Sequence, residues 1–141
     1  SMRDLVVVGY GASELVAVLE KWASSVGRVL RPDPEAEKGF YYRSDHFNFA
    51  KVGIPALYTD AGIDHVVHGE EWTLARREEY TAQNYHQPSD EYDPAWDLAG
   101  AMDDLHLYYA VGYDLANSDA WPNWREGNEF KAARDADRPG S

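Results

Sequence analysis

The segment that most limits how this chain can fold is a short run of apolar residues near its start. Residues 5–8 read Leu-Val-Val-Val and are followed by the Gly-Tyr-Gly sequence of residues 9–11. A continuous β-branched run is typical of a strand buried on both faces, as in a parallel sheet covered by helices. Apolar residues then recur at helical spacing, which predicts an amphipathic helix over about 13–26, capped by Ser13 and ended by Gly27.

The rest of the chain repeats this alternation. Strands are expected over 28–31 and 54–58, and helices over 44–52, 70–80 and 97–116. The last helix is the longest, with Asp97 as its cap and an apolar stripe formed by Leu98, Met102, Leu105, Tyr109 and Tyr113. In the tail after residue 116, Trp121 and Trp124 are expected to pack on the body, and residues 138–141 to fray. Alternating strands and helices predict an α/β fold, here with only about three strands.

Charge and composition exclude several classes of protein. The net charge is -12, from 25 acidic and 13 basic residues, which argues against binding to nucleic acid or to anionic membranes. The chain has no cysteine, which excludes disulfides, thiolate zinc sites and cysteine nucleophiles. No stretch approaches the roughly 18 apolar residues that a membrane span needs.

Two polar segments carry residue types that do chemistry. One contains Asp45 and His46, and the other contains Tyr85, His86 and Asp90. A loop histidine flanked by aspartates can bind a metal through one ring nitrogen while a carboxylate orients the other nitrogen. The same residues also suit helix caps and turns. Residue chemistry alone leaves both interpretations open.

The order and spacing of these segments resemble the C-terminal part of the M28 family of zinc peptidases. The resemblance rests on Ser-Asp-His-x-x-Phe at 44–49, Gly-Ile-Pro-Ala at 53–56 and Tyr-His-x-Pro-x-Asp at 85–90. It implies a partial three-layer α/β/α sandwich with a mostly parallel sheet over 1–116, followed by a tail over 117–141. It also implies a zinc-dependent metallopeptidase, in particular an aminopeptidase that hydrolyses peptide bonds through water activated by two zinc ions.

The same resemblance implies a role for each of five residues. His86 matches the family's last zinc ligand, on the loop before the final helix. Tyr85 lies where a tyrosine hydroxyl would stabilise the oxyanion of a tetrahedral intermediate. Asp90 would orient His86 or brace the loop, while Asp45 and His46 would lie at the rim of the substrate pocket.

One departure from the family pattern is large. The family's other ligands and its general base precede the matched part, and no His-x-Asp pair occurs here. We therefore interpret the chain as the C-terminal portion of a peptidase domain that is inactive on its own, with zinc absent or incompletely bound. Cutting a sheet exposes an apolar edge, so we expect a homo-oligomer formed through the truncated sheet face. The resemblance also suggests an exported protein.

Two other functions remain open at this point. A non-catalytic α/β module could have kept the fold for binding or assembly after losing the metal site. Chemistry like that of glutaminyl cyclases, which resemble the family closely, is the third possibility. Metal ligands and a Glu-Glu pair encoded upstream would establish the peptidase, and their absence would favour the module.

Overall fold

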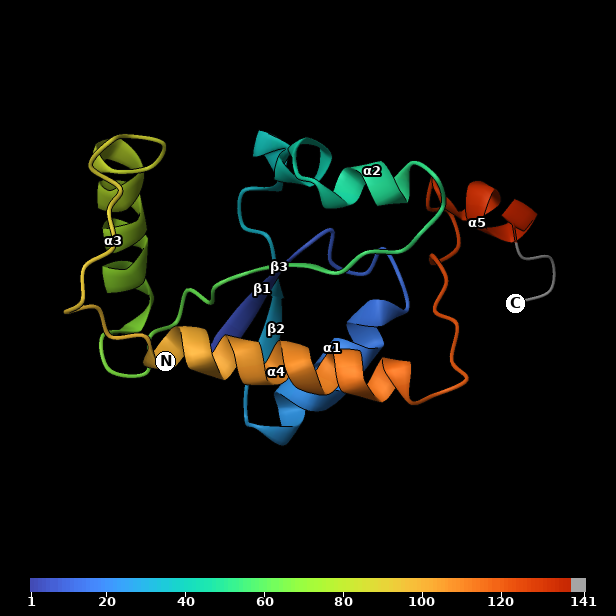
Figure 1. The fold of residues 1–141 in the computed structure, drawn as a ribbon, viewed down its shortest axis with the longest axis horizontal. Helices are drawn as coiled ribbons and strands as arrows, with labels where there is room; N and C mark the ends of the chain where they lie inside the picture. The colour runs from blue at the N-terminus through green and yellow to red at the C-terminus, as the bar shows by residue number, and fades with distance from the viewer. Residues whose placement is uncertain (138–141) are drawn as a thin grey trace.

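The computed structural model describes residues 1–137 and shows an α/β fold (Figure 1). Its elements are β1 (Asp4–Val8), α1 (Leu15–Ser25), β2 (Val29–Pro32), η1 (Ala36–Lys38), η2 (Phe40–Arg43), α2 (His46–Ala50), β3 (Tyr58–Asp60), α3 (Gly69–Gln83), α4 (Ala99–Ala116) and α5 (Lys131–Asp137). The predicted fraying of residues 138–141 lies outside the described residues. No helix within residues 1–137 is both long and apolar enough to cross a membrane.

The three strands form a mixed sheet in the order β2-β1-β3. β2 pairs parallel to β1, whereas β3 pairs antiparallel to it, with Tyr58 opposite Val8. The expected mostly parallel sheet and three-layer sandwich are therefore not found among these residues. The cause is that η2 and α2 lie beyond the carboxyl end of β1, so the chain returns along the sheet in the opposite direction. β3 also begins later than predicted, since Pro55 has no N–H to donate to a ladder.

The main core lies between the sheet and two helices on one face of it. Leu5 and Val7 of β1 pack with Leu19 of α1 and with Leu107 and Val111 of α4, and all five side chains are buried. Burying one such side chain contributes roughly 1.5–3 kcal/mol. The predicted strand over 5–8 and the helix after it are confirmed, and they form the centre of the fold.

The two ends of α1 differ from each other in how they form. At the C-terminal end Gly27 adopts φ +74°, the left-handed conformation predicted for a residue that stops a helix. At the N-terminal end the prediction that Ser13 caps the helix is wrong. Glu14 occupies the cap position without a side-chain cap, and Ser13 is buried in a bridge to Trp124. Contacts with the tail thus replace the expected cap.

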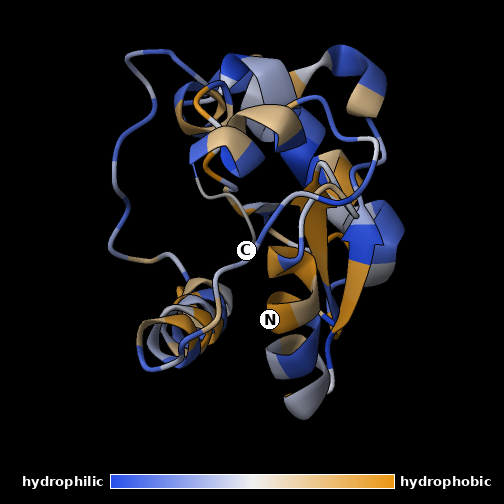
Figure 2. Cartoon of the chain, turned by 90° about the vertical axis from the view of Figure 1, so that its right-hand side faces the viewer, coloured by the Kyte–Doolittle hydropathy of each residue, from blue (hydrophilic) through white to orange (hydrophobic). Residues whose placement is uncertain are grey.

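α4 turns a different face to the core than its stripe suggests. Leu107 and Val111 face α1, while the predicted stripe of Leu98, Met102, Leu105, Tyr109 and Tyr113 is 48–71% exposed. The helix is apolar on both sides, as Figure 2 shows for α4 seen nearly end-on, so periodicity alone cannot choose between them. Asp104 pairs with Arg28 and Asp114 with Lys21, and both pairs agree with this rotation of the helix. The prediction that Asp97 caps the helix is wrong by one residue: Leu98 occupies the cap position without a side-chain cap, and the Asp97 carboxylate accepts the Ala99 N–H at 2.9 Å from just before it.

The tail after α4 packs back on the body, as predicted. Trp124 is 2% exposed, and its indole N–H donates to the Gly53 carbonyl at 2.9 Å. Phe130 joins it in a small second core under α2. Trp121 stays half exposed, with the Arg134 guanidinium over its ring. The tail therefore supports the α2 region rather than the main core.

Candidate functional site

Tyr85 and His86 lie on the turn that directly follows α3. The Tyr85 N–H donates to the Tyr80 carbonyl, which ends the helix. His86 has φ +58°, and within residues 1–137 it is the one residue other than glycine with a positive φ. The two rings stack with centroids 3.9 Å apart, and both side chains are exposed. The predicted ligand and the predicted oxyanion donor are thus neighbours on an open surface.

Asp90 is joined to α3 rather than to His86. Its carboxylate accepts the Tyr80 hydroxyl at 2.8 Å, and this hydrogen bond raises the pKa of Tyr80. The contact closes a turn from α3 back to the loop. A hollow of about 380 Å³ lies beside this contact, and it is lined by Arg76, Glu79, Tyr80, Gln83, Asn84, Ser89, Asp90, Glu91, Asp93 and Trp96. Of the two roles expected for Asp90, this contact corresponds to bracing the loop.

Asp45 and His46 begin α2. Asp45 is exposed and makes no side-chain cap to the helix. The His46 ring lies between the rings of Tyr41 and Tyr58, with centroids 4.7 and 4.9 Å away. Both its ring nitrogens are buried without a hydrogen-bond partner, and burial lowers its pKa. His46 is therefore held as a neutral ring in an aromatic setting.

A second hollow lies at the carboxyl ends of the parallel strands β1 and β2. It measures about 320 Å³, and its lining includes Gly9, Asp33, Tyr41 and Phe130. Tyr41 packs directly on Gly9, where a Cβ atom would come within 2.5 Å of its ring. Burial raises the pKa of Tyr41 to about 12, so its hydroxyl stays protonated. Sequence reasoning missed Tyr41 as a site residue, although the Gly-Tyr-Gly turn after β1 indicated a close backbone approach there.

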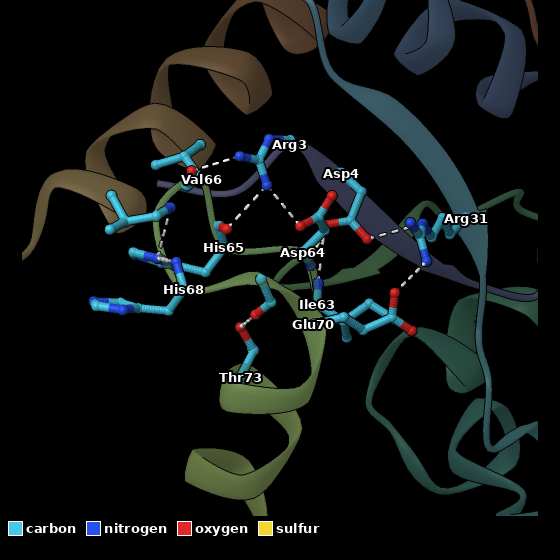
Figure 3. Close-up of polar contacts among 12 residues, drawn as sticks. Arg3, Asp4, Arg31, Ile63, Asp64, His65, Val66, His68, Glu70 and Thr73 are labelled. Atoms are coloured by element: carbon cyan, nitrogen blue, oxygen red, sulfur yellow. Dashed lines mark hydrogen bonds and ion pairs between the residues drawn. The ribbon is translucent and has the colours of Figure 1, made fainter.

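A buried carboxylate fixes the start of the segment that leads to α3 (Figure 3). Asp4 is fully buried, and one of its oxygens accepts the backbone N–H groups of Ile63 and Asp64 at 3.0 and 2.9 Å. Its other oxygen pairs with Arg31 at 3.1 Å. Gly62 packs so closely that a Cβ atom would lie 2.3 Å from the Asp4 carbonyl oxygen. Asp4 thereby ties the segment before α3 to β1.

The two motif segments are not brought together. Figure 1 shows the loop after α3 at one side of the molecule and α2 above the sheet, well separated from that loop. The hollow beside α3 is lined by Ser89 and Asp90 of one segment, the hollow at the ends of β1 and β2 is lined by no residue of 44–49, and neither is lined by His86 or His46. Among residues 1–137 no group of three or more His, Cys, Asp or Glu side chains could hold a metal ion.

Comparison with known proteins decides what these segments belong to. The model of Peptidase family M28 matches residues 2–110, from before β1 into α4. The chain belongs to the M28 peptidase family. Comparisons with curated proteins and with solved structures find no match. The M28 match contains both motif segments and the Asp4 anchor, whereas Trp124 and the rest of the tail lie beyond it.

M28 peptidases are typically zinc-dependent. A catalytic zinc takes three protein ligands, and the neutral nitrogen of a histidine is a suitable one. Within residues 1–137 His86 belongs to no group of three or more His, Cys, Asp or Glu side chains that could hold a metal ion. The described residues therefore do not fit a zinc ion by themselves, and no catalytic step through the metal follows from them.

Proposed function

We propose that this chain is the C-terminal part of a zinc-dependent M28 aminopeptidase. The observation that carries the proposal is the family match over residues 2–110, which includes the Tyr85–His86 turn. Residues 1–116 then belong to the catalytic domain and residues 117–141 form its tail. The substrate is a peptide with a free N-terminus. Export of the protein is proposed from the family resemblance alone.

In this proposal His86 is the one metal ligand that this part of the domain contributes. Its positive φ supports a functional role, because holding a side chain other than glycine in that conformation costs roughly 1–3 kcal/mol. Such strain is concentrated at ligand-binding and catalytic positions. Tyr85 stacks on His86 and would place its hydroxyl beside the reacting carbonyl. Asp90 acts on the turn through Tyr80.

The α2 region would form a wall of the substrate pocket. Asp45 is exposed at the start of α2, which suits contact with a substrate. His46 is neutral and enclosed, so its role is to shape the wall together with Tyr41 and Tyr58. The carboxyl ends of parallel strands are where open α/β sheets bind ligands, and this wall lies at those ends.

Zinc binding and hydrolysis of aminoacyl-nitroanilides test the proposal. The chain alone should show no turnover and only weak zinc binding, and His86→Ala should weaken that binding at least tenfold. His68→Ala is the matched control, since His68 lies before α3 and outside the proposed site, and it should leave zinc binding unchanged. Tight stoichiometric zinc with turnover by this chain alone would contradict the part-domain interpretation.

The coding sequence upstream of Arg3 gives an independent test. A His-x-Asp pair, further acidic ligands and a Glu-Glu pair should be encoded there. A protein that includes them should bind zinc and hydrolyse the substrate, and His86→Ala should abolish turnover. An upstream sequence without these residues would leave the peptidase proposal without its ligands.

A second candidate is a non-catalytic α/β module for binding or assembly. The observation that favours it is the lack of any three-residue metal-binding group within residues 1–137. The upstream sequence separates the two candidates, because only the peptidase requires ligands there.

A further inference from the structure

One face of α4 is an apolar surface that no other described element covers. Leu98, Met102, Leu105, Tyr109 and Tyr113 are each 48–71% exposed. At 3.6 residues per turn their directions fall within about 80° of one another, on the side opposite Leu107 and Val111. A helix that is apolar on two opposite sides is normally covered on both. The core accounts for only one side of α4.

The size of this face is sufficient for a specific interface. Large aromatic side chains bury about 150–250 Å² each when fully covered. Tyr109 and Tyr113, at 71% and 59% exposure, therefore offer roughly 100–150 Å² each. With the three aliphatic side chains the face amounts to roughly 500 Å². Two such faces, when fully covered, bury about 1,000 Å² together, which is the lower limit for a specific protein–protein interface.

The charges around the face argue against a basic partner. α4 carries three carboxylates, of Asp103, Asp104 and Asp114, and none of them lies on the stripe. Asp104 is paired with Arg28 at 2.6 Å, and Asp114 with Lys21 at 2.7 Å. A basic segment would find two of the three already neutralised. The face therefore offers shape and apolar area, with little charge to attract a cation.

The order of the side chains makes the face complementary to itself. In an antiparallel pair of α4 helices with Leu105 near the two-fold axis, Leu98 faces Tyr113 of the other copy, and Met102 faces Tyr109. Each small aliphatic group then meets a ring. An isologous contact of this kind closes after two copies and leaves no further apolar surface on the helix.

We propose that a second copy of this chain covers the exposed face of α4 in an antiparallel, two-fold symmetric dimer. The helix face is a better site than the sheet edge, because β2 is four residues long and ends in Arg31 and Pro32, both of which discourage strand pairing. The dimer does not require peptidase activity. Under the proposed function the rest of the domain is the other candidate occupant of this face, so a monomer in the test below overturns the dimer and leaves the proposed function standing.

Sedimentation equilibrium on the intact chain tests the dimer. The expected mass is twice the 15.9 kDa of one chain at micromolar concentration. Leu105→Glu should weaken the dimer at least a hundredfold. Val29→Glu, on exposed edge strand β2, is the control and should leave it unchanged. Far-UV circular dichroism identifies any variant that fails to fold. A monomer at all concentrations, an open-ended series of larger species, or greater sensitivity at Val29 would overturn the proposal.

Single cysteine substitutions test whether the two α4 helices are antiparallel. The chain has no native cysteine, so any disulfide must come from the introduced residues. Leu105→Cys, near the axis, should form an intermolecular disulfide under mild oxidation. Leu98→Cys alone should not, whereas mixing it with Tyr113→Cys should give a cross-linked pair. Efficient self-cross-linking of Leu98→Cys would indicate parallel helices and overturn the antiparallel arrangement.

Because each copy carries a charge of -12, added salt should strengthen the dimer. Dissociation by salt would instead mean an interface held by opposite charges, and would also overturn the proposal.

Discussion

The two motif segments of this chain have opposite surroundings. The α2 region is enclosed: His46 lies between two tyrosine rings, and Trp124 and Phe130 of the tail pack beneath it. The turn after α3 is open, and Tyr85 and Trp96 near it are about half exposed. Both segments lie within the same M28 match. Membership in a family motif therefore does not decide whether a segment is packed.

The contrast indicates which part of the site this chain builds unaided. The α2 wall takes its shape from contacts among residues 1–137. The His86 turn is held mainly by its own backbone and by the Tyr80–Asp90 hydrogen bond. Under the proposed function, the missing packing at the turn comes from the part of the domain that carries the other ligands. The following variants test this difference, starting with the largest expected effect.

Trp124→Ala should destabilise the protein by about 3–5 kcal/mol, because it leaves a cavity beneath α2 and removes the hydrogen bond to Gly53. Trp96→Ala is the matched control on the open side, and should change the free energy of unfolding by less than about 1 kcal/mol. Urea denaturation measures both. Equal losses would remove the contrast between the two regions.

Gly53→Ala should cost about 2–3 kcal/mol. Gly53 has φ +84°, and a Cβ atom there would lie 2.5 Å from the backbone nitrogen of Arg134, so the tail would have to move. Gly11→Ala is the control: its φ is +80°, but no atom lies within 4 Å of the added group. That variant should lose only about 1 kcal/mol, from backbone strain. A Gly11 variant as unstable as the Gly53 variant would show that the tail contact adds nothing.

The pH dependence of stability should report the burial of His46. Burial lowers the pKa of His46 below its ordinary value of 6.5, so the unfolded chain takes up the proton first. The contribution of neutral His46 to the free energy of unfolding is therefore fully present above pH 6.5. It declines as the pH falls from 6.5 towards the lowered pKa of His46. His46→Phe should remove this part of the slope between pH 7.5 and 5. Denaturation of the parent and the variant at several pH values measures the slopes, and identical slopes would contradict the enclosed state of His46.

The smallest effect is expected from Tyr80→Phe. Without the hydroxyl, the turn over residues 84–90 should exchange its amide hydrogens faster, while exchange in the core is unchanged. In the unmutated protein the hydrogen bond to Asp90 raises the pKa of the Tyr80 hydroxyl above its ordinary value of 10.0. The hydrogen bond should therefore persist at pH 10 and be lost as the pH rises through the raised pKa, where the hydroxyl loses its proton. Tyr92→Phe, at an exposed ring, is the control for hydrogen exchange. Unchanged exchange in the Tyr80 variant would mean that the backbone alone holds the turn.

The elements that could be predicted from the sequence are those that a short stretch of residues specifies by itself. The apolar run over 5–8 predicted a buried strand and Gly27 predicted the end of the helix before it, and both are confirmed. Asp97 was predicted as a cap and lies one residue before the cap position, which Leu98 occupies. The order of the motifs likewise placed Tyr85 and His86 correctly on a turn between two helices. Local chemistry was sufficient for the strand, the helix end and the turn.

The elements that could not be predicted depend on contacts between distant residues. α4 is apolar on two faces, and which one is buried shows only in its contacts with other elements, among them the packing of Leu107 and Val111 and the ion pairs of Asp104 and Asp114. The direction of β3 depends on where α2 lies. Asp4 resembles an ordinary residue before a strand, yet its partners are about sixty positions away. The hydrogen bond between Tyr80 and Asp90 likewise requires the path of the turn.

The packing of Trp124 has a practical consequence for where this protein can be shortened. The family match ends at residue 110, and a boundary drawn there would look natural. It would leave the Gly53 carbonyl without its indole donor, and would uncover the Ser13 bridge at the start of α1. A truncated chain would thus lose support at two places far from the cut. The segment that matches the family, residues 2–110, is therefore shorter than the segment whose residues pack together in this structure.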